Sequence, residues 1–189
     1  MKRIFDILLG IVIIFILFIP MIIITICILL TSKGGAFYWS KRVGRSHGAH
    51  STFMMPKFRT MYIDAPEVAT HLFKNPDKFL TPIGGFLRTT SLDELPQLYS
   101  IIKGDMSFVG PRPALFNQND LISLRVKSGV DKLVPGVTGW AQINGRDNLS
   151  IPDKVALEIV YLNHKSFFFD IKIIWLTVLR VFKREGISH

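Results

Sequence analysis

The feature that most constrains this chain is a long uncharged segment at its N-terminus. No residue from Ile7 through Leu30 carries a charge, and basic residues stand on both sides, with Lys2 and Arg3 before it and Lys33 after it. As an α-helix with a rise of about 1.5 Å per residue the segment is roughly 36 Å long, whereas the hydrocarbon core of a bilayer is about 30 Å thick. The segment therefore predicts a helix embedded in a membrane.

Three interpretations of this segment differ in topology. A secretory signal is disfavoured, because the apolar run is too long and no small-residue cleavage site closes it. A plain spanning anchor is the simplest alternative. Against it stand Pro20, which removes a backbone hydrogen bond within the run, and the basic flanks, each of which favours the cytoplasmic side. A helix that bends at Pro20 and returns to the same membrane face fits both features, so re-entry and spanning both stay open here.

The remainder of the 189-residue chain has room for one further domain. Composition changes abruptly after Lys33, so we divide the chain into a membrane segment, residues 1–33, and a second domain, residues 34–189. The single cysteine, Cys27, excludes a disulfide within the chain, which fits a domain that faces the cytosol.

The charge of the chain suggests an anionic partner. Lysine and arginine outnumber aspartate and glutamate by 23 to 14, a net charge of +9, although 49% of the residues are hydrophobic. Apolar and basic character together favour an anionic membrane surface or a phosphate-bearing ligand, and the charge alone would also fit nucleic acid.

Local patterns predict a mainly helical α+β domain with a small β element. Segments 36–40 and 52–61 are candidate strands. Ser91-Leu92-Asp93-Glu94 has the form of a capping box and would open a helix that ends at Lys103-Gly104, and a second helix is expected from Ser150 to about His164. A third is expected to begin near Asp170. Its broad apolar face, its basic face and the preceding run of phenylalanines favour a helix that lies in the headgroup region over one packed on the core.

Asp93 and Glu94 are the leading candidates for chemistry. In a first helical turn, an ionised carboxylate is favoured by the helix dipole, and an ionised carboxylate is what a nucleophile or a metal ligand requires. Acidic residues are also common in first turns, where they only cap the helix. Arg88 precedes the pair and Arg112 follows it between two prolines, and arginines near ionised carboxylates suit a phosphoryl-transfer site in which Mg²⁺ screens the charge.

Further cations and several absent motifs limit the kinds of functional site that the sequence allows. Lys57-Phe58-Arg59 and Asn144-Gly145-Arg146 supply cations that would bind either a phosphate or anionic lipid. The sequence has no zinc-type spacing of histidine and cysteine, no GxxxxGK[ST] and no GxGxxG. A transition-metal enzyme and a kinase-like nucleotide site are therefore disfavoured.

Four stretches resemble the bacterial sugar transferases, specifically the small monotopic phosphoglycosyl transferases. They are KFRTM from Lys57, LRTTSLDELPQL from Leu87, KGDMSFVGPRP from Lys103 and PGVTGWAQINGR from Pro135. They cover most of the chain after residue 40 in the family's order. One departure concerns the membrane segment, where Ile19 stands before Pro20 in place of the family's serine, and a hydroxyl partner for a freed backbone carbonyl is missing.

The resemblance implies an enzyme on the cytoplasmic face of the bacterial inner membrane. It implies that a phosphosugar passes from a UDP-sugar to polyprenol (undecaprenyl) phosphate through a covalent intermediate, with release of UMP, at the start of glycan or glycoconjugate assembly. The implied partners are the UDP-sugar, polyprenol phosphate and membrane lipid, with no nucleic acid. The implied cofactor is Mg²⁺.

The resemblance also implies roles for individual residues. Asp93 matches the nucleophile and approaches Mg²⁺, and Glu94 matches the second member of the catalytic dyad. Arg88 and Arg112 match positions expected to contact the nucleotide or its phosphates, and Arg59 and Arg146 fall in motifs expected to bind substrate. The main competing hypothesis is a membrane-anchored binding module without catalysis, and a lipid phosphatase is the second. The binding module assigns no purpose to the carboxylate pair between two arginines, and for a phosphatase water would suffice as the acceptor.

Overall fold

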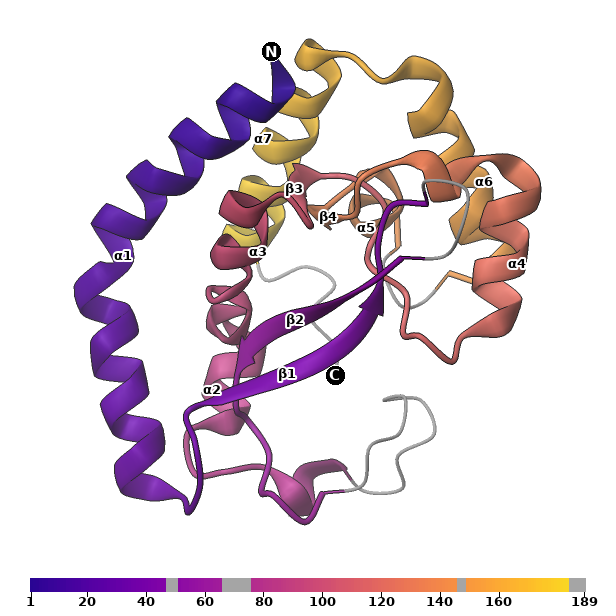
Figure 1. Cartoon of the computed structure of the whole chain (residues 1–189). Coiled ribbons are helices and arrows are strands. Elements are labelled where there is room, and N and C mark those ends of the chain that lie inside the picture. The colour runs from indigo at the N-terminus through magenta and orange to yellow at the C-terminus, as the bar shows by residue number, and fades with distance from the viewer. Residues whose placement is uncertain (47–50, 66–75, 146–148, 184–189) are drawn as a thin grey trace.

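The computed structural model describes residues 1–46, 51–65, 76–145 and 149–183. It is a mostly helical α+β structure with small sheets, as the sequence predicts. The long helix α1 (Lys2–Thr31) forms one side of the molecule, and a β-hairpin crosses its middle. In the view of Figure 1, the helices Gln97–Lys103 and Phe167–Lys183 stand between α1 and the hairpin, and the helices Asn119–Ser128 and Ile151–His164 stand on the opposite side of the molecule.

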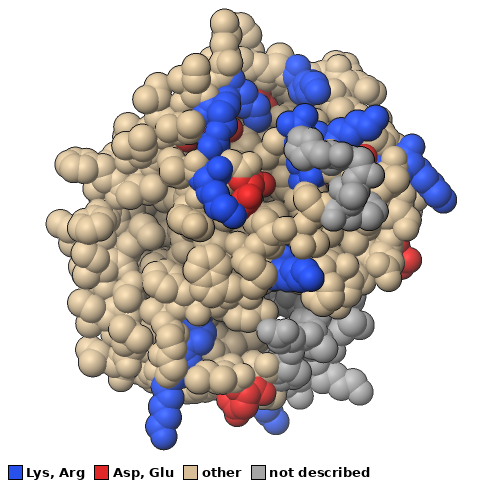
Figure 2. Space-filling view, in the orientation of Figure 1, with Lys and Arg blue, Asp and Glu red and all other residues tan. Residues whose placement is uncertain are grey.

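Helix α1 is continuous and contains Pro20 within it. It is long and apolar enough to cross a membrane. One face packs on the rest of the chain, whereas most of its large apolar side chains are exposed: Ile4, Leu8, Ile11, Val12, Phe15, Ile16, Phe18, Ile19, Ile22, Ile23, Ile26, Leu29 and Leu30. On the face seen in Figure 2, lysine and arginine gather mainly in the upper half, while the left edge, where α1 runs, shows no charged atoms. The outer surface of α1 therefore suits hydrocarbon and not water.

Both ends of α1 are attached to the domain that follows it. At the start, Lys2 Nζ lies 2.6 Å from Asp170 Oδ2 and 2.9 Å from the carbonyl oxygen of Val109, and the buried Asp6 accepts a hydrogen bond from the backbone N–H of Phe108. At the end, the guanidinium of Arg59 donates to the carbonyl oxygens of residues 32–35. Segment 1–33 is thus packed along the domain and is not a detached anchor.

The two predicted strands form an antiparallel hairpin. Strand β1 (Phe37–Val43) pairs with β2 (Thr52–Phe58), in a register that places Tyr38 opposite Lys57. This register brings side chains far apart in the sequence to one site, because directly opposed residues lie on the same face of a hairpin.

The segment from 76 to 104 holds short helices. They are η2 (Pro76–Phe79), α2 (Gly84–Thr89), η3 (Leu92–Glu94) and α3 (Gln97–Lys103). The predicted single helix opened by a capping box at Ser91 is wrong. Ser91 has φ 57° and its side chain makes no capping hydrogen bond, so a one-turn 3-10 helix carries Asp93 and Glu94 and α3 begins after Pro96. Proline lacks the N–H that a helix interior needs and is tolerated at its start.

The later elements enclose a second, parallel pair of strands. Strand β3 (Ser107–Val109) pairs with β4 (Gly136–Thr138). The helices are α4 (Asn119–Ser128), η4 (Val130–Lys132), α5 (Trp140–Ile143), α6 (Ile151–His164) and α7 (Phe167–Lys183). The prediction for α6 is confirmed, including its cap, since Ser150 Oγ accepts from the backbone N–H of Asp153 at 3.3 Å.

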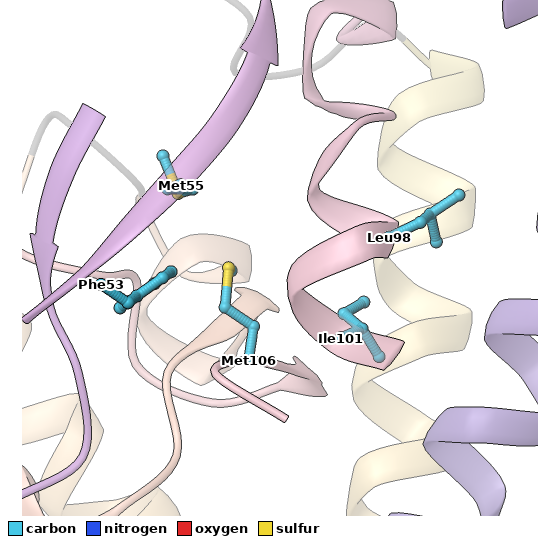
Figure 3. Packing of buried hydrophobic residues seen from close by; sticks show 5 residues of the cluster. All are labelled: Phe53, Met55, Leu98, Ile101 and Met106. Carbon is cyan, nitrogen blue, oxygen red and sulfur yellow. The ribbon is translucent and has the colours of Figure 1, made fainter. Parts of the chain in front are cut away.

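The core is shared between α1, the hairpin and α3. One cluster joins Phe53 and Met55 of β2 to Leu98 and Ile101 of α3 and to Met106 (Figure 3). Ile13 and Ile14 of α1 pack against this cluster, and Met21 and Ile24 pack against a second cluster built around Phe58 and Leu87. Removal of α1 from its place would therefore expose two parts of the core.

Helix α7 buries a narrow stripe and exposes its apolar face. Ile173 and Asp170 are buried, and Thr177 hydrogen-bonds to Thr138 of β4. The exposed apolar residues are Phe167, Phe168, Ile171, Trp175, Val178 and Leu179. The side chains of the predicted apolar face are thus largely outside the core, which is the arrangement expected of an interfacial helix.

Candidate active site

Asp93 and Glu94 are placed by a short rigid turn. Ser91 occupies the left-handed region, the chain then makes the single turn of η3, and Leu92 and Leu95 on either side pack into the core cluster of Phe58 and Leu87. The two carboxylates are held on the surface of the core by these apolar neighbours. The sequence suggested that a helix dipole stabilises the ionised form of these carboxylates. In the structure, neighbouring charged side chains take that role.

Glu94 is held by two cations. Its Oε1 lies 2.7 Å from Lys57 Nζ and 3.0 Å from Arg112 Nη2, and its side chain is almost entirely buried. Burial alone would raise the pKa of Glu94, but the positive charges and hydrogen bonds of Arg112 and Lys57 hold this pKa well below its ordinary value. Glu94 therefore stays ionised at any pH at which the protein works.

Asp93 has the opposite environment. It is 8% exposed, Lys57 Nζ lies 3.6 Å from its Oδ2, and within the part of the chain that the structure describes its carboxylate makes no hydrogen bond. Burial raises the pKa of Asp93 above its ordinary value, and the positive charge of Lys57 offsets part of this rise. A carboxylate that is poorly solvated and free of hydrogen-bond donors keeps its electron pairs available for attack.

The loop that carries Arg112 is fixed on both sides. The backbone N–H of Gly110 donates to the carbonyl oxygen of Thr138 and that of Gly136 donates to the carbonyl oxygen of Pro111, each at 2.9 Å. A side chain at Gly110 would place its Cβ 2.2 Å from the carbonyl oxygen of Val134, so only glycine allows this close approach. Two strands and two prolines thus hold Arg112 next to Glu94.

Arg88 approaches the pair from α2. It is the basic residue in the last turn of that helix, its Nη2 lies 3.9 Å from the sulfur of Met61, and its charge helps to lower the pKa of Asp93. The structure therefore brings together four of the residues singled out from the sequence, namely Asp93, Glu94, Arg88 and Arg112.

The remaining two predicted substrate-binding residues are not part of this cluster. Arg59 is 7% exposed, and its guanidinium is occupied by the carbonyl oxygens that follow α1 and by Ser32 Oγ at 3.0 Å. Through these contacts Arg59 has a structural role, because it satisfies backbone carbonyl groups at the C-terminal end of α1. Arg146 lies outside the described residues.

Two further cations lie at the site. Lys57, which the sequence suggested only as a cation for phosphate or lipid, contacts both carboxylates. Arg42 of β1, which the sequence did not single out, lies close enough to Glu94 and Arg112 to be affected by their charges. The signal for Lys57 was its place in the KFRTM stretch. For Arg42 no local pattern exists, because only the hairpin brings it near residues 94 and 112.

The residues fit a Mg²⁺ ion that is completed by the substrate. Within the described residues, no group of three or more His, Cys, Asp or Glu side chains converges as a metal cage would. Mg²⁺ in phosphoryl-transfer enzymes is commonly bound by one or two carboxylates together with substrate phosphates and water. Asp93 can supply such a carboxylate, since Glu94 is already engaged by two cations.

Comparison with known proteins shows what this chain is similar to. The family model described as bacterial sugar transferase matches residues 1–184. The "Uncharacterized sugar transferase EpsL" of Bacillus subtilis (strain 168) is 38% identical over 192 residues, which cover 100% of this chain and 91% of that protein. The "Exopolysaccharide production protein ExoY" of Rhizobium meliloti (strain 1021) is 37% identical, with 98% of this chain and 87% of that protein covered.

A longer relative has a more specific name. The "UDP-glucose:undecaprenyl-phosphate glucose-1-phosphate transferase" of Escherichia coli (strain K12) is 36% identical over 194 residues, which cover 98% of this chain. The chain spans only 41% of that protein's length, so the part shared with it contains the whole cluster around Asp93 but not the rest of the relative.

Proposed function

Because this chain belongs to the bacterial sugar transferase family, we propose that it transfers a sugar 1-phosphate from a UDP-sugar to undecaprenyl phosphate through a covalent bond to Asp93. The observation that carries the proposal is the difference between the two neighbouring carboxylates. Glu94 is neutralised by Lys57 and Arg112, whereas Asp93 is buried among cations without a hydrogen bond in the described part of the chain. Such a pair provides one positioning group and one nucleophile.

The proposed reaction has two displacements at the same phosphorus. An oxygen of Asp93 bonds to the β-phosphorus of the UDP-sugar as the bond to the bridging oxygen breaks, and UMP leaves with that oxygen. An oxygen of undecaprenyl phosphate then bonds to the phosphorus, the bond to Asp93 breaks, and its carboxylate is restored. Arg112 and Lys57 supply charge-assisted donors where negative charge develops on the phosphoryl oxygens, and Glu94 fixes both of them.

We propose Mg²⁺ as the cofactor, with Asp93 as its protein ligand. When bound, the ion would neutralise charge on the diphosphate and so reduce its repulsion of the carboxylates. Arg88, on the same side as Asp93, adds a cation from the protein itself.

The same proposal includes a membrane arrangement with α1 as a re-entrant helix. Lys2 and Asp6 of α1 contact the domain, and Arg59 of the domain holds the residues that follow α1, so a spanning α1 would have to lose the contacts of Lys2 and Asp6. The exposed apolar surfaces of α1 and α7 would lie in one leaflet of the inner membrane. The site would then face the cytoplasm at the level of the lipid headgroups, where undecaprenyl phosphate presents its phosphate.

The proposed function is tested by UMP release. Purified protein in nanodiscs is incubated with Mg²⁺, undecaprenyl phosphate and each member of a panel of UDP-sugars, and UMP and the lipid product are measured together. We expect both to form in equal amounts with at least one sugar. Free sugar phosphate formed without lipid product would instead indicate a hydrolase, and no release from any donor would contradict the proposal.

The environment of Asp93 predicts a shift of the pH profile. The nucleophile must be ionised, and burial raises the pKa of Asp93, so activity should rise with pH through a value above that of an ordinary aspartate. Lys57→Met removes the cation that lowers this pKa most. The rising limb of kcat/KM against pH should therefore move to higher pH.

The control for this shift is Lys41→Met. Lys41 lies on β1, the strand paired with the one that carries Lys57, and its side chain is exposed. Its profile should coincide with that of the unmodified enzyme. A Lys57→Met enzyme that is slower but has the same rising limb would show that Asp93 does not control the profile.

The attachment of Lys2 predicts the position of the N-terminus. In a Cys27→Ala background, a cysteine placed in a short extension before Met1 should be protected from a membrane-impermeant maleimide in intact cells and labelled after permeabilisation. Replacing both Lys2 and Arg3 by alanine removes the contacts to Asp170 and to the carbonyl oxygens of residues 101 and 102, together with two cytoplasm-favouring charges. Labelling in intact cells should then increase.

One control variant and one further test variant are labelled in the same way. Lys165→Ala removes an exposed basic residue that is not part of the attachment and should leave the extension protected. Pro20→Leu restores the helical hydrogen bond and should raise labelling by favouring a straight spanning helix. Labelling of the unmodified sequence in intact cells would show that α1 spans the membrane.

A further inference from the structure

Arg42 is a partly buried cation that has no acidic ion-pair partner in the part of the chain that the structure describes. Its Nε donates to Ser40 Oγ at 2.9 Å and its Nη1 to the carbonyl oxygen of Pro113 at 3.2 Å. Within the described residues it forms no ion pair, whereas Lys57 and Arg112 both pair with Glu94. A guanidinium removed from water normally gains a carboxylate or phosphate as compensation.

The environment of Arg42 makes its charged form less favourable. Burial and the positive charge of Arg112 lower the pKa of Arg42 to about 10, and Tyr38 and Glu94 oppose this only in part. Glu94 is already shared by two other cations. Among the described residues, Glu94 therefore does not compensate the charge of Arg42, and the anionic oxygens of a bound phosphate would do so.

The contacts also place Arg42 relative to the nucleophile. Arg112 Nη2 lies 3.0 Å from Glu94 Oε1, and Arg42 Nη1 donates to the carbonyl oxygen of Pro113, the residue after Arg112, at 3.2 Å. Among the described residues the ion pair of Asp93 is with Lys57, and Arg42 makes no contact with Asp93. Arg42 therefore borders Arg112 and not the nucleophile.

We propose that Arg42 and Arg112 together bind the phosphate of the donor that is not attacked, the one that departs with the nucleoside. This inference rests on the proposed function and assigns a subsite to its leaving group. With the attacked phosphorus at Asp93, the second phosphate of a diphosphate lies next along the chain of cations. As the bond to the bridging oxygen breaks, that phosphate gains the electron pair, and two guanidinium groups donate to it where the charge appears.

A purely structural role for Arg42 makes a different prediction. Its hydrogen bond to Pro113 could serve only to hold the loop that carries Arg112. Glutamine can make that hydrogen bond without a charge, and lysine keeps the charge with a different shape. Comparing Arg42→Gln with Arg42→Lys therefore distinguishes a role of the positive charge from a role in holding the loop that carries Arg112.

The experiment measures inhibition by UMP and by uridine, against the UDP-sugar that the enzyme uses. For Arg42→Gln we expect the inhibition constant of UMP to rise at least tenfold, with that of uridine and the thermal unfolding midpoint unchanged. Arg42→Lys should retain a substantial part of the UMP affinity. Lys41→Ala, at the neighbouring exposed position, should behave as the unmodified enzyme.

Several outcomes would overturn the inference. They are an unchanged inhibition constant for UMP in Arg42→Gln, a loss that affects UMP and uridine equally, and equal losses in the Gln and Lys variants. Failure of the unmodified protein to release UMP from any UDP-sugar is a separate result, which would remove the proposed function itself.

Discussion

Replacing Asp93 by asparagine should abolish UMP release while leaving the protein folded. Loss of the nucleophile removes the covalent route altogether, and the expected fall in kcat is on the order of 10⁴-fold. Stability should not fall with it. Burial raises the pKa of Asp93, so folding disfavours its ionised form at neutral pH, and a neutral asparagine avoids that penalty. We expect an unfolding midpoint equal to or above that of the unmodified protein.

The covalent intermediate gives this variant a direct readout. Protein incubated with UDP-sugar and Mg²⁺ in the absence of lipid should gain the mass of a phosphosugar on the peptide that contains Asp93. The Asp93→Asn protein should gain none, whereas Glu94→Gln should form the adduct slowly, because Lys57 and Arg112 lose their shared partner. Normal turnover without an adduct under rapid quench, with kinetics that require both substrates bound together, would favour direct transfer.

The sequence predicted the centre of this site better than its surroundings. Asp93, Glu94, Arg88 and Arg112 lie within one stretch of chain, where residue type and spacing are informative. Lys57 and Arg42 reach the same place through the hairpin, whose register sets Tyr38 opposite Lys57. Pairing between distant segments leaves no periodic mark around Arg42, so local pattern analysis had no means to include it.

Arg59 was predicted to bind substrate, and in the structure its guanidinium has other partners. Its place in a basic motif suggested a phosphate ligand, but β2 ends at Phe58 and the chain then turns toward the residues after α1. There its guanidinium meets several backbone carbonyls that the helix end leaves without partners. Composition alone does not distinguish a cationic side chain that binds substrate from one that donates to the carbonyl oxygens at the end of a helix.

The N-terminal helix also makes contacts that local sequence patterns do not reveal. Length and hydropathy predict a long apolar helix, and the structure confirms the helix and approximately its extent. They treat Lys2 as a topological signal only, although in the folded chain Lys2 binds Asp170 and Tyr161, and Asp6 binds the backbone of β3. These partners lie more than a hundred residues away in the sequence.

The largest stability effect is expected away from the site, at a buried ion pair between α4 and α6. Arg125 Nε donates to Glu158 Oε2 at 2.8 Å and Arg125 Nη2 to Glu158 Oε1, with the two residues 8% and 2% exposed. Glu158→Ala leaves the guanidinium buried without its partner, so unfolding in detergent or nanodiscs should require about 3–5 kcal/mol less free energy. The exposed pair of Lys103 and Asp105 is the matched control, and Asp105→Ala should change the free energy of unfolding by less than about 1 kcal/mol.

A double variant separates charge isolation from lost packing at this pair. Arg125→Met with Glu158→Leu removes both charges and keeps apolar volume beside Leu121 and Val155, so it should recover most of the stability lost in Glu158→Ala. Recovery would show that the unpaired guanidinium causes the loss. If the double variant is as unstable as Glu158→Ala, the pair itself holds α4 against α6. Because Ala114 belongs to the same cluster and stands two residues after Arg112, UMP release should then also fall in the double variant.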